Sequence, residues 1–154
     1  MKVYTLNIGQ IATHKGEAQY QCFGLGSCVG LFLSDRSTGV TGAAHILLPG
    51  NERGPDDKGW YSADVAFDEL IRRLRQLGSS LDSLSAKLAG GANTLNAQDN
   101  GGKNVESVMK QLRERRIFVA GSDVGGSQSR TVCYETISGS LTVRRSGDRI
   151  GTIL

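Results

Sequence analysis

Two mostly apolar runs on either side of a polar segment form the clearest pattern in the first third of the chain. Residues 29–33 and 40–48 are apolar or small except for His45, whereas 34–39 holds only polar, charged or glycine residues. This pattern predicts a β-hairpin. Pairing Ser34 with Gly39 around a four-residue loop places Cys28 directly opposite His45, with both side chains on one face. The opposite face is expected to be core and carries Val29, Leu31, Leu33, Val40, Ala44 and Ile46.

Helical periodicity appears in two later segments. From 63 to 77 the apolar positions recur every three to four residues, Ser62 can cap the start, and Gly78 can end the helix. A second helix is expected from Asn104, which is predicted to be its cap. Its buried stripe would consist of Val105, Val108, Met109, Leu112 and Ile117.

The remaining segments read as short strands and loops. Strands are expected at 2–8, 19–23, 85–89, 117–120, 130–135 and 141–145. Loops or turns are expected at 12–17, 50–59, 90–93 and 123–126, and a loose tail at 148–154. Because strands come first and last with two helices between them, and no domain break is visible, the sequence predicts one α+β domain over 1–154.

Composition narrows the choice of partners and compartment. The chain has 154 residues, of which 38% are hydrophobic, so one domain with a sizeable core is expected. A net charge of +3 without a Lys/Arg-rich block, together with 6% aromatic residues, argues against nucleic-acid binding. No stretch approaches the roughly 18 consecutive apolar residues of a membrane span, and no signal-peptide core is present. We therefore expect a cytoplasmic protein without membrane insertion.

The cysteines favour reduced thiols over a disulfide framework. Cys22, Cys28 and Cys133 are an odd number in a chain without a secretory signal. With two histidines and none of the usual ligand spacings, a metal site is not predicted, although Cys22, Cys28 and His45 could converge.

The hairpin suggests nucleophilic chemistry. A cysteine opposite a histidine can act as a nucleophile with its general base. The glycine-containing turn before Cys28 could let the backbone N–H groups of Ser27 and Cys28 bind a developing oxyanion. The alternative remains that Cys28 only packs in the core and that His45 is a hydrogen-bonded structural residue.

Five segments in order resemble the CheD family of chemoreceptor glutamine deamidases. They are Gly24 to Val29, Gly42 to Pro49, Gly90 to Asn93, Asn104 to Glu106 and Asp123 to Gly126. The resemblance implies a β-sandwich flanked by helices, similar to the cytotoxic necrotizing factor deamidases. It also implies deamidation of receptor glutamines by Cys28 and His45, with no cofactor. The implied partners are the helical cytoplasmic part of chemoreceptors and a CheC-type phosphatase.

One position departs from the family pattern. Cys22 lies where the family usually has a threonine that completes a Cys-His-Thr triad. Since sulfur is a weak acceptor, His45 would be less firmly oriented by Cys22. Alternatively, Cys22 simply packs while a backbone carbonyl orients His45, or Cys22 and Cys28 form a reversible disulfide. Two other functions stay open, a different cysteine acyl hydrolase and a non-catalytic chemotaxis adaptor.

Overall fold

The computed structural model describes residues 1–93 and 100–154, which form two five-stranded sheets and two helices in one α+β domain. The central sheet has the order β2-β5-β4-β6-β7 and the outer sheet has the order β1-β3-β8-β9-β10. The central strands are β2 (Ile11–Lys15), β5 (Val40–Ile46), β4 (Val29–Asp35), β6 (Leu84–Gly90) and β7 (Phe118–Val124). The outer strands are β1 (Lys2–Thr5), β3 (Ala18–Leu25), β8 (Arg130–Glu135), β9 (Leu141–Arg145) and β10 (Thr152–Ile153).

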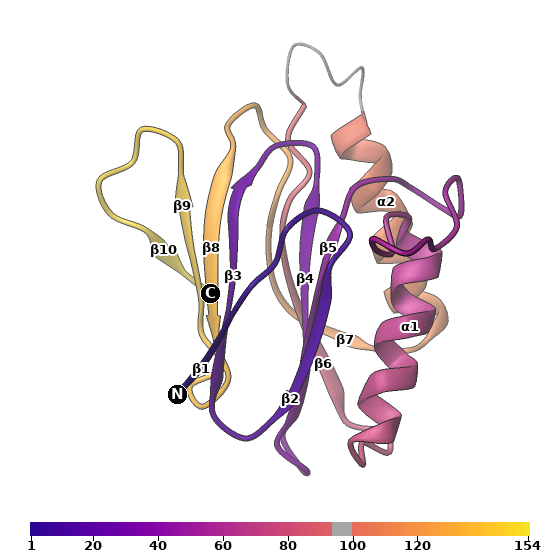
Figure 1. The fold of residues 1–154 in the computed structure, drawn as a ribbon. Coiled ribbons are helices and arrows are strands. Elements are labelled where there is room, and N and C mark those ends of the chain that lie inside the picture. Colours follow the sequence, from indigo (N-terminus) through magenta and orange to yellow (C-terminus); the bar gives the residue numbers. More distant parts are fainter. Residues whose placement is uncertain (94–99) are drawn as a thin grey trace.

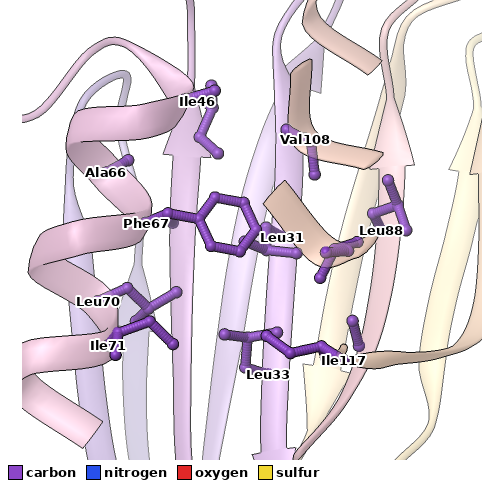
Figure 2. Close-up of a cluster of buried hydrophobic side chains, with 14 of the residues drawn as sticks. Leu31, Leu33, Ile46, Ala66, Phe67, Leu70, Ile71, Leu88, Val108 and Ile117 are labelled. Atoms are coloured by element: carbon purple, nitrogen blue, oxygen red, sulfur yellow. The ribbon is translucent and has the colours of Figure 1, made fainter. Parts of the chain in front are cut away.

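The molecule has three layers (Figure 1), because both helices cover the same face of the central sheet and the outer sheet packs on the other. Helix α1 spans Ala63–Gln76 and α2 spans Asn100–Glu114. The hairpin face predicted as core packs against these helices. Figure 2 shows Leu31, Leu33 and Ile46 of the sheet meeting Phe67 of α1 and Val108 of α2. All six residues predicted for that face belong to this cluster.

A second core fills the space between the two sheets. Its aromatic part stacks Tyr134 on Phe32 at 5.4 Å and on Tyr20 at 6.4 Å between ring centroids. Cys22 and Cys28 lie in the same cluster. The face of the hairpin that carries Cys28 therefore points between the sheets, away from the helices.

The hairpin register differs from the prediction: both ends of the turn lie one residue later, so the residue opposite His45 is two positions further along the chain than predicted. Asp35, not Ser34, opens the turn and pairs with Val40, so His45 lies opposite Gly30. The Asp35 side chain accepts hydrogen bonds from the Ser37 N–H and hydroxyl, which fixes the turn one residue later. Cys28 and His45 are thus diagonal neighbours. A two-residue shift preserves the alternation of side chains, so the shared face predicted for them holds.

Three other expectations for local structure are corrected. Most of the predicted loop at 12–17 is strand β2, because its backbone pairs with β5. Helix α2 begins at Asn100, so Asn104 lies inside it and is not its cap. The predicted loose tail contains β10, which pairs with β9. In each case, hydrogen bonds to distant residues decide the conformation, and a local pattern does not contain them.

The first helix agrees with the prediction, with one difference at its start. Ser62 occupies the N-cap position of α1, but its hydroxyl makes no cap hydrogen bond and instead accepts the Arg53 N–H at 2.7 Å. This bond ties the exposed 50–59 loop to the start of the helix. Within the described ranges, neither helix is long and apolar enough to cross a membrane.

Candidate active site

Cys28 sits in the short connection between β3 and β4, directly before the first residue of β4. Its side chain is 7% exposed and belongs to the core between the sheets. The carbonyl oxygens of three consecutive residues, Gly26, Ser27 and Cys28, each accept a hydrogen bond. The donors are, in the same order, the Ala92 N–H at 2.8 Å, the Asn104 side-chain amide at 2.9 Å and the Gly91 N–H at 2.8 Å. This connection is therefore fixed from outside the hairpin.

The backbone N–H groups of the same connection differ from its carbonyls in their hydrogen bonding. Among residues 1–93 and 100–154, no acceptor is found for the N–H groups of Ser27 and Cys28. Free backbone donors beside a nucleophile are suited to binding the oxygen of a tetrahedral intermediate. The geometry is thus compatible with the oxyanion site expected at Ser27 and Cys28.

His45 is held in β5 by the segment between β1 and β2. Its Nδ1 lies 2.9 Å from the Leu6 carbonyl oxygen. The backbone N–H of His45 donates to the Gln10 carbonyl at 3.1 Å, and the backbone carbonyl of His45 accepts the Gly9 N–H at 2.9 Å. Because a carbonyl can only accept, Nδ1 carries the proton and Nε2 is left with a lone pair. His45 therefore has the tautomer required of a general base acting through Nε2.

Burial sets the charge state of both groups. Burial raises the pKa of the Cys28 thiol to about 11. Burial also lowers the pKa of His45, an effect that the hydrogen bond to Leu6 only partly opposes. Near neutral pH the pair is therefore a thiol and a neutral imidazole, and not a thiolate with an imidazolium.

Cys28 and His45 share a face without a hydrogen bond between them in the described part of the chain. Diagonal neighbours on adjacent strands have Cα atoms roughly 7–8 Å apart. Catalytic hydrogen bonds are often long before substrate binds, so this separation is compatible with a dyad.

Cys22 lies beside this pair on β3 and is fully buried. Its pKa is raised to about 12, first by burial and then by the nearby Cys28. The Leu6 carbonyl, and not Cys22, accepts the imidazole N–H. All three cysteines are free thiols. In the described residues, no three His, Cys, Asp or Glu side chains are placed to hold a metal ion.

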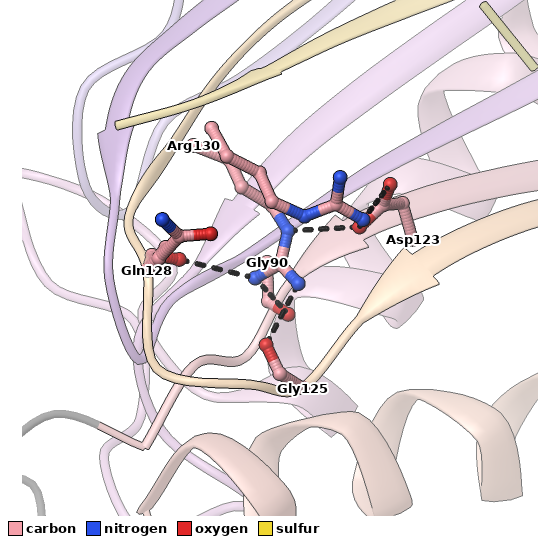
Figure 3. Close-up of polar contacts among 6 residues, drawn as sticks. Gly90, Asp123, Gly125, Gln128 and Arg130 are labelled. Carbon is pink, nitrogen blue, oxygen red and sulfur yellow. Dashed lines mark hydrogen bonds and ion pairs between the residues drawn. The ribbon is translucent and has the colours of Figure 1, made fainter. Parts of the chain in front are cut away.

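A buried arginine supports the backbone behind Cys28. Figure 3 shows Arg130 of β8 donating to Asp123 of β7 and to the carbonyls of Gly90, Gly125 and Gln128. Gly90 precedes Gly91, whose N–H holds the Cys28 carbonyl. Strand β7 extends to Val124, so the turn expected at 123–126 begins only after that residue. Through its hydrogen bond to Arg130, the Gly125 carbonyl of this turn helps to position the site indirectly.

The sequence pattern missed two groups that hold the site. The Leu6 carbonyl could not be identified from the sequence, because every residue has a backbone carbonyl oxygen. Asn104 could have been identified, since Asn104, Val108 and Leu112 recur at four-residue intervals on the buried face of α2. A polar residue within an apolar helical stripe indicates a specific hydrogen-bond partner.

Comparisons with known proteins agree on one family. The family model for CheD chemotactic sensory transduction matches residues 47–145, a span that starts after Cys28 and His45. The "Chemoreceptor glutamine deamidase CheD" of Thermotoga maritima is 35% identical, covering 92% of this chain and 91% of the relative. The protein of the same name from Halalkalibacterium halodurans is 41% identical, covering 79% and 80%. A Methanococcus maripaludis relative named "Probable chemoreceptor glutamine deamidase CheD" is 34% identical, covering 95% and 97%. The chain therefore belongs to the CheD family.

Proposed function

We propose that this protein is a chemoreceptor glutamine deamidase, which hydrolyses glutamine side chains of a receptor to glutamate and releases ammonia. One observation carries this proposal: the Thermotoga maritima relative bearing that name matches over 92% of the chain. The paired thiol and imidazole between the sheets supply chemistry suited to the reaction.

The reaction is an acyl transfer in which Cys28 is the nucleophile. Nε2 of His45 takes the thiol proton as the sulfur attacks the carboxamide carbon, and the N–H groups of Ser27 and Cys28 bind the oxyanion. The imidazolium then protonates the amide nitrogen as it departs as ammonia, and the acyl group remains bound to the Cys28 sulfur as a thioester. His45 next removes a proton from water, whose oxygen attacks the thioester, and the sulfur leaves with the proton. These steps use protein groups and water, so the mechanism needs no cofactor.

The raised pKa of Cys28 gives His45 a definite task in this mechanism. A thiol with a pKa of about 11 is almost entirely protonated near neutral pH. Attack therefore depends on proton transfer to His45 as the carbon–sulfur bond forms. The neutral imidazole, with Nδ1–H held by Leu6, is in the correct state to accept it.

The family also implies finer features that we include in the proposal. The substrate surface is the helical cytoplasmic part of a chemoreceptor, a CheC-type phosphatase is a binding partner, and the protein works in the cytoplasm. A fold likeness to cytotoxic necrotizing factor deamidases is part of the same proposal. Superposition on those enzymes tests the last point, and co-purification tests the phosphatase.

Mass spectrometry of a receptor cytoplasmic fragment incubated with the protein tests the activity. We expect glutamine peptides to gain the mass difference between glutamine and glutamate, without peptide cleavage. Cys28→Ala should remain folded and lower the rate by more than about 10³-fold, because it removes the nucleophile. His45→Ala should also lose most of the activity.

Cys133→Ala is the matched control, since Cys133 is a half-buried cysteine of β8 on which the mechanism does not depend. This variant should retain the parent rate. Peptide cleavage would instead indicate another cysteine hydrolase, and binding of the fragment without any mass change would indicate an adaptor. Substantial turnover by Cys28→Ala would disprove the mechanism.

A further inference from the structure

Asn104 joins the two segments that carry the proposed dyad. Its side chain projects from α2 into the protein and is fully buried. The amide nitrogen Nδ2 donates to the Ser27 carbonyl at 2.9 Å and to the Leu47 carbonyl at 2.8 Å. Ser27 directly precedes Cys28, and Leu47 follows His45 by two residues. One side-chain amide thus contacts the backbone next to both reactive groups.

These bonds lie where the hairpin ladder stops. The pairing of β4 with β5 ends at Val29 opposite Ile46, so Cys28 and Leu47 lie beyond the last paired residues. Other elements hold each segment separately, since the Cys28 carbonyl accepts the Gly91 N–H and the Leu47 N–H donates to the Tyr61 carbonyl, but no ladder hydrogen bond joins Cys28 to Leu47. The two bonds from Asn104 join these segments directly through one side chain, and so help to set how far the Cys28 backbone lies from the strand of His45.

The end of α2 that carries Asn104 is itself fixed in place. The helix approaches the backbone of Gly91 and Ala92 so closely that a Cβ on Gly101 would lie 2.3 Å from the Ala92 carbonyl oxygen. Only glycine permits this approach. Gly91 and Ala92 in turn donate to the carbonyls of Cys28 and Gly26. Helix α2, the backbone of Gly91 and Ala92, and the connection that carries Cys28 are therefore in direct contact.

The amide oxygen of Asn104 does not account for the burial of an amide at this position. Oδ1 is buried and has no hydrogen-bond partner among the described residues. Burying an acceptor without a partner lowers stability, and an apolar side chain of similar size would avoid this cost only by removing the donor of the Ser27 and Leu47 carbonyls. The benefit of Asn104 therefore lies in the two bonds that its nitrogen makes.

We infer that Asn104 is a positioning residue of the active site, which holds the Ser27–Cys28 backbone against the His45 strand so that the thiol reaches Nε2. The inference rests on the proposed role of the Cys28–His45 dyad. It predicts that loss of the two Nδ2 hydrogen bonds weakens the coupling between the reactive groups while the fold persists.

The first experiment compares Asn104→Leu with the parent on a receptor fragment. We expect kcat to fall about 10- to 100-fold with little change in KM, because misplacement of a reactive group by about 1 Å has effects of this size. Gln111→Leu is the matched control, since Gln111 is an amide on the same helix that bonds Asp64 of α1 at 2.8 Å, away from the site. This control should keep the parent kcat.

The second experiment needs no receptor and measures alkylation of Cys28 by iodoacetamide, with the modified cysteine identified by peptide mapping. In the parent background, His45→Ala should slow the reaction, because the base is lost. In the Asn104→Leu background, His45→Ala should have little further effect. Such non-additivity reports coupling through Asn104, and a purely structural residue would not produce it.

The outcomes of the two experiments distinguish the proposed deamidase function from the positioning role of Asn104. A parent protein without deamidase activity would refute the proposed function, while the alkylation cycle would still decide the role of Asn104. An equal effect of His45→Ala in both backgrounds, no effect in the parent, or an Asn104→Leu kcat no lower than that of Gln111→Leu would overturn the inference. Should Asn104→Leu not fold, Asn104→Ser serves in both experiments, because its side chain is too short to reach both carbonyls.

Discussion

His45 is oriented by a main-chain oxygen, and this changes the role expected of Cys22. The Leu6 N–H donates to the Gln21 carbonyl, and the Leu6 carbonyl accepts from His45 Nδ1. The segment after β1 thus connects Gln21, the residue before Cys22, to His45. A backbone carbonyl is a strong acceptor, whereas a thiol sulfur is a weak one. The departure from the family threonine at position 22 therefore does not leave the imidazole unoriented.

A substitution at this position tests the inherited triad role. We expect Cys22→Thr to fold and to be at least as active as the parent under reducing conditions, because Leu6 still holds the imidazole and a hydroxyl adds a second acceptor. Activity on a receptor fragment measures this, with Cys133→Thr on the neighbouring strand as the control. A large loss confined to Cys22→Thr would show that Cys22 has a role of its own.

The same variant tests the redox alternative. If Cys22 and Cys28 form a reversible disulfide, mild oxidation should inactivate the parent but spare Cys22→Thr, and a thiol reductant should restore the parent. Equal loss in both proteins would exclude that switch.

At the scale of elements, an ion-pair cluster connects the two sheets behind the candidate active site. Asp123 of β7 in the central sheet accepts from Arg130 of β8 at 3.0 Å and from Arg145 of β9 at 2.6 Å. The side chains of Asp123 and Arg130 are 8% and 3% exposed. Because Arg130 also holds the Gly90 and Gly125 carbonyls, this cluster fixes the turn beside the nucleophile as well as the sheets.

We expect Asp123→Ala to lower the free energy of unfolding by about 3–5 kcal/mol, because it leaves the Arg130 charge buried without its partner. Urea unfolding followed by circular dichroism measures the change. Glu114→Ala removes the exposed Lys110–Glu114 pair, whose side chains are 65% and 58% exposed, and should cost less than about 1 kcal/mol. Equal losses in the two variants would contradict the structural role given to the cluster.

At the scale of the whole molecule, burial in the core between the two sheets favours the neutral forms of the ionisable groups that lie there. Burial lowers the pKa of His45 from its ordinary 6.5 and raises the pKa values of Cys28 and Cys22 to about 11 and about 12. It also raises the pKa of Tyr20, which stacks in the same core. The folded protein therefore resists protonation of His45 and ionisation of the thiols.

This arrangement predicts that stability is highest between about pH 6.5 and 9. Below 6.5 the unfolded chain protonates His45 while the folded protein does not, so stability falls as the pH decreases toward the lowered pKa of His45. Above 9 the unfolded chain ionises its thiols while the folded chain keeps them neutral, so stability falls as the pH rises. Each group changes the free energy of unfolding by about 1.4 kcal/mol per pH unit within its range.

Urea unfolding at several pH values measures this dependence. His45→Gln should flatten the acidic limb by one proton, and Cys22→Ala should reduce the alkaline limb. An acidic limb of unchanged slope in His45→Gln would show that other groups cause the loss of stability at low pH.

Local patterns were sufficient to predict the elements that depend on periodicity. The stripe from Ala63 to Leu77 predicted α1, because an amphipathic helix records in its sequence which side faces the core. The face that runs from Val29 to Ile46 was predicted for the same reason, since alternation survives a two-residue error in register. The shared face of Cys28 and His45, and hence the candidate site, followed from that alternation.

Contacts between distant residues decided the rest. The residue opposite His45 was set by the Asp35 turn, and strand β2 by pairing with β5. The Leu6 carbonyl reaches His45 across 39 positions of sequence, and the Asn104 amide reaches Ser27 across 77. The acceptor in each of these bonds is a main-chain carbonyl, which every residue possesses, so only the packed chain determines which carbonyl each side chain meets. The sequence therefore determined which side chains can react, and the tertiary structure determined what holds them in position.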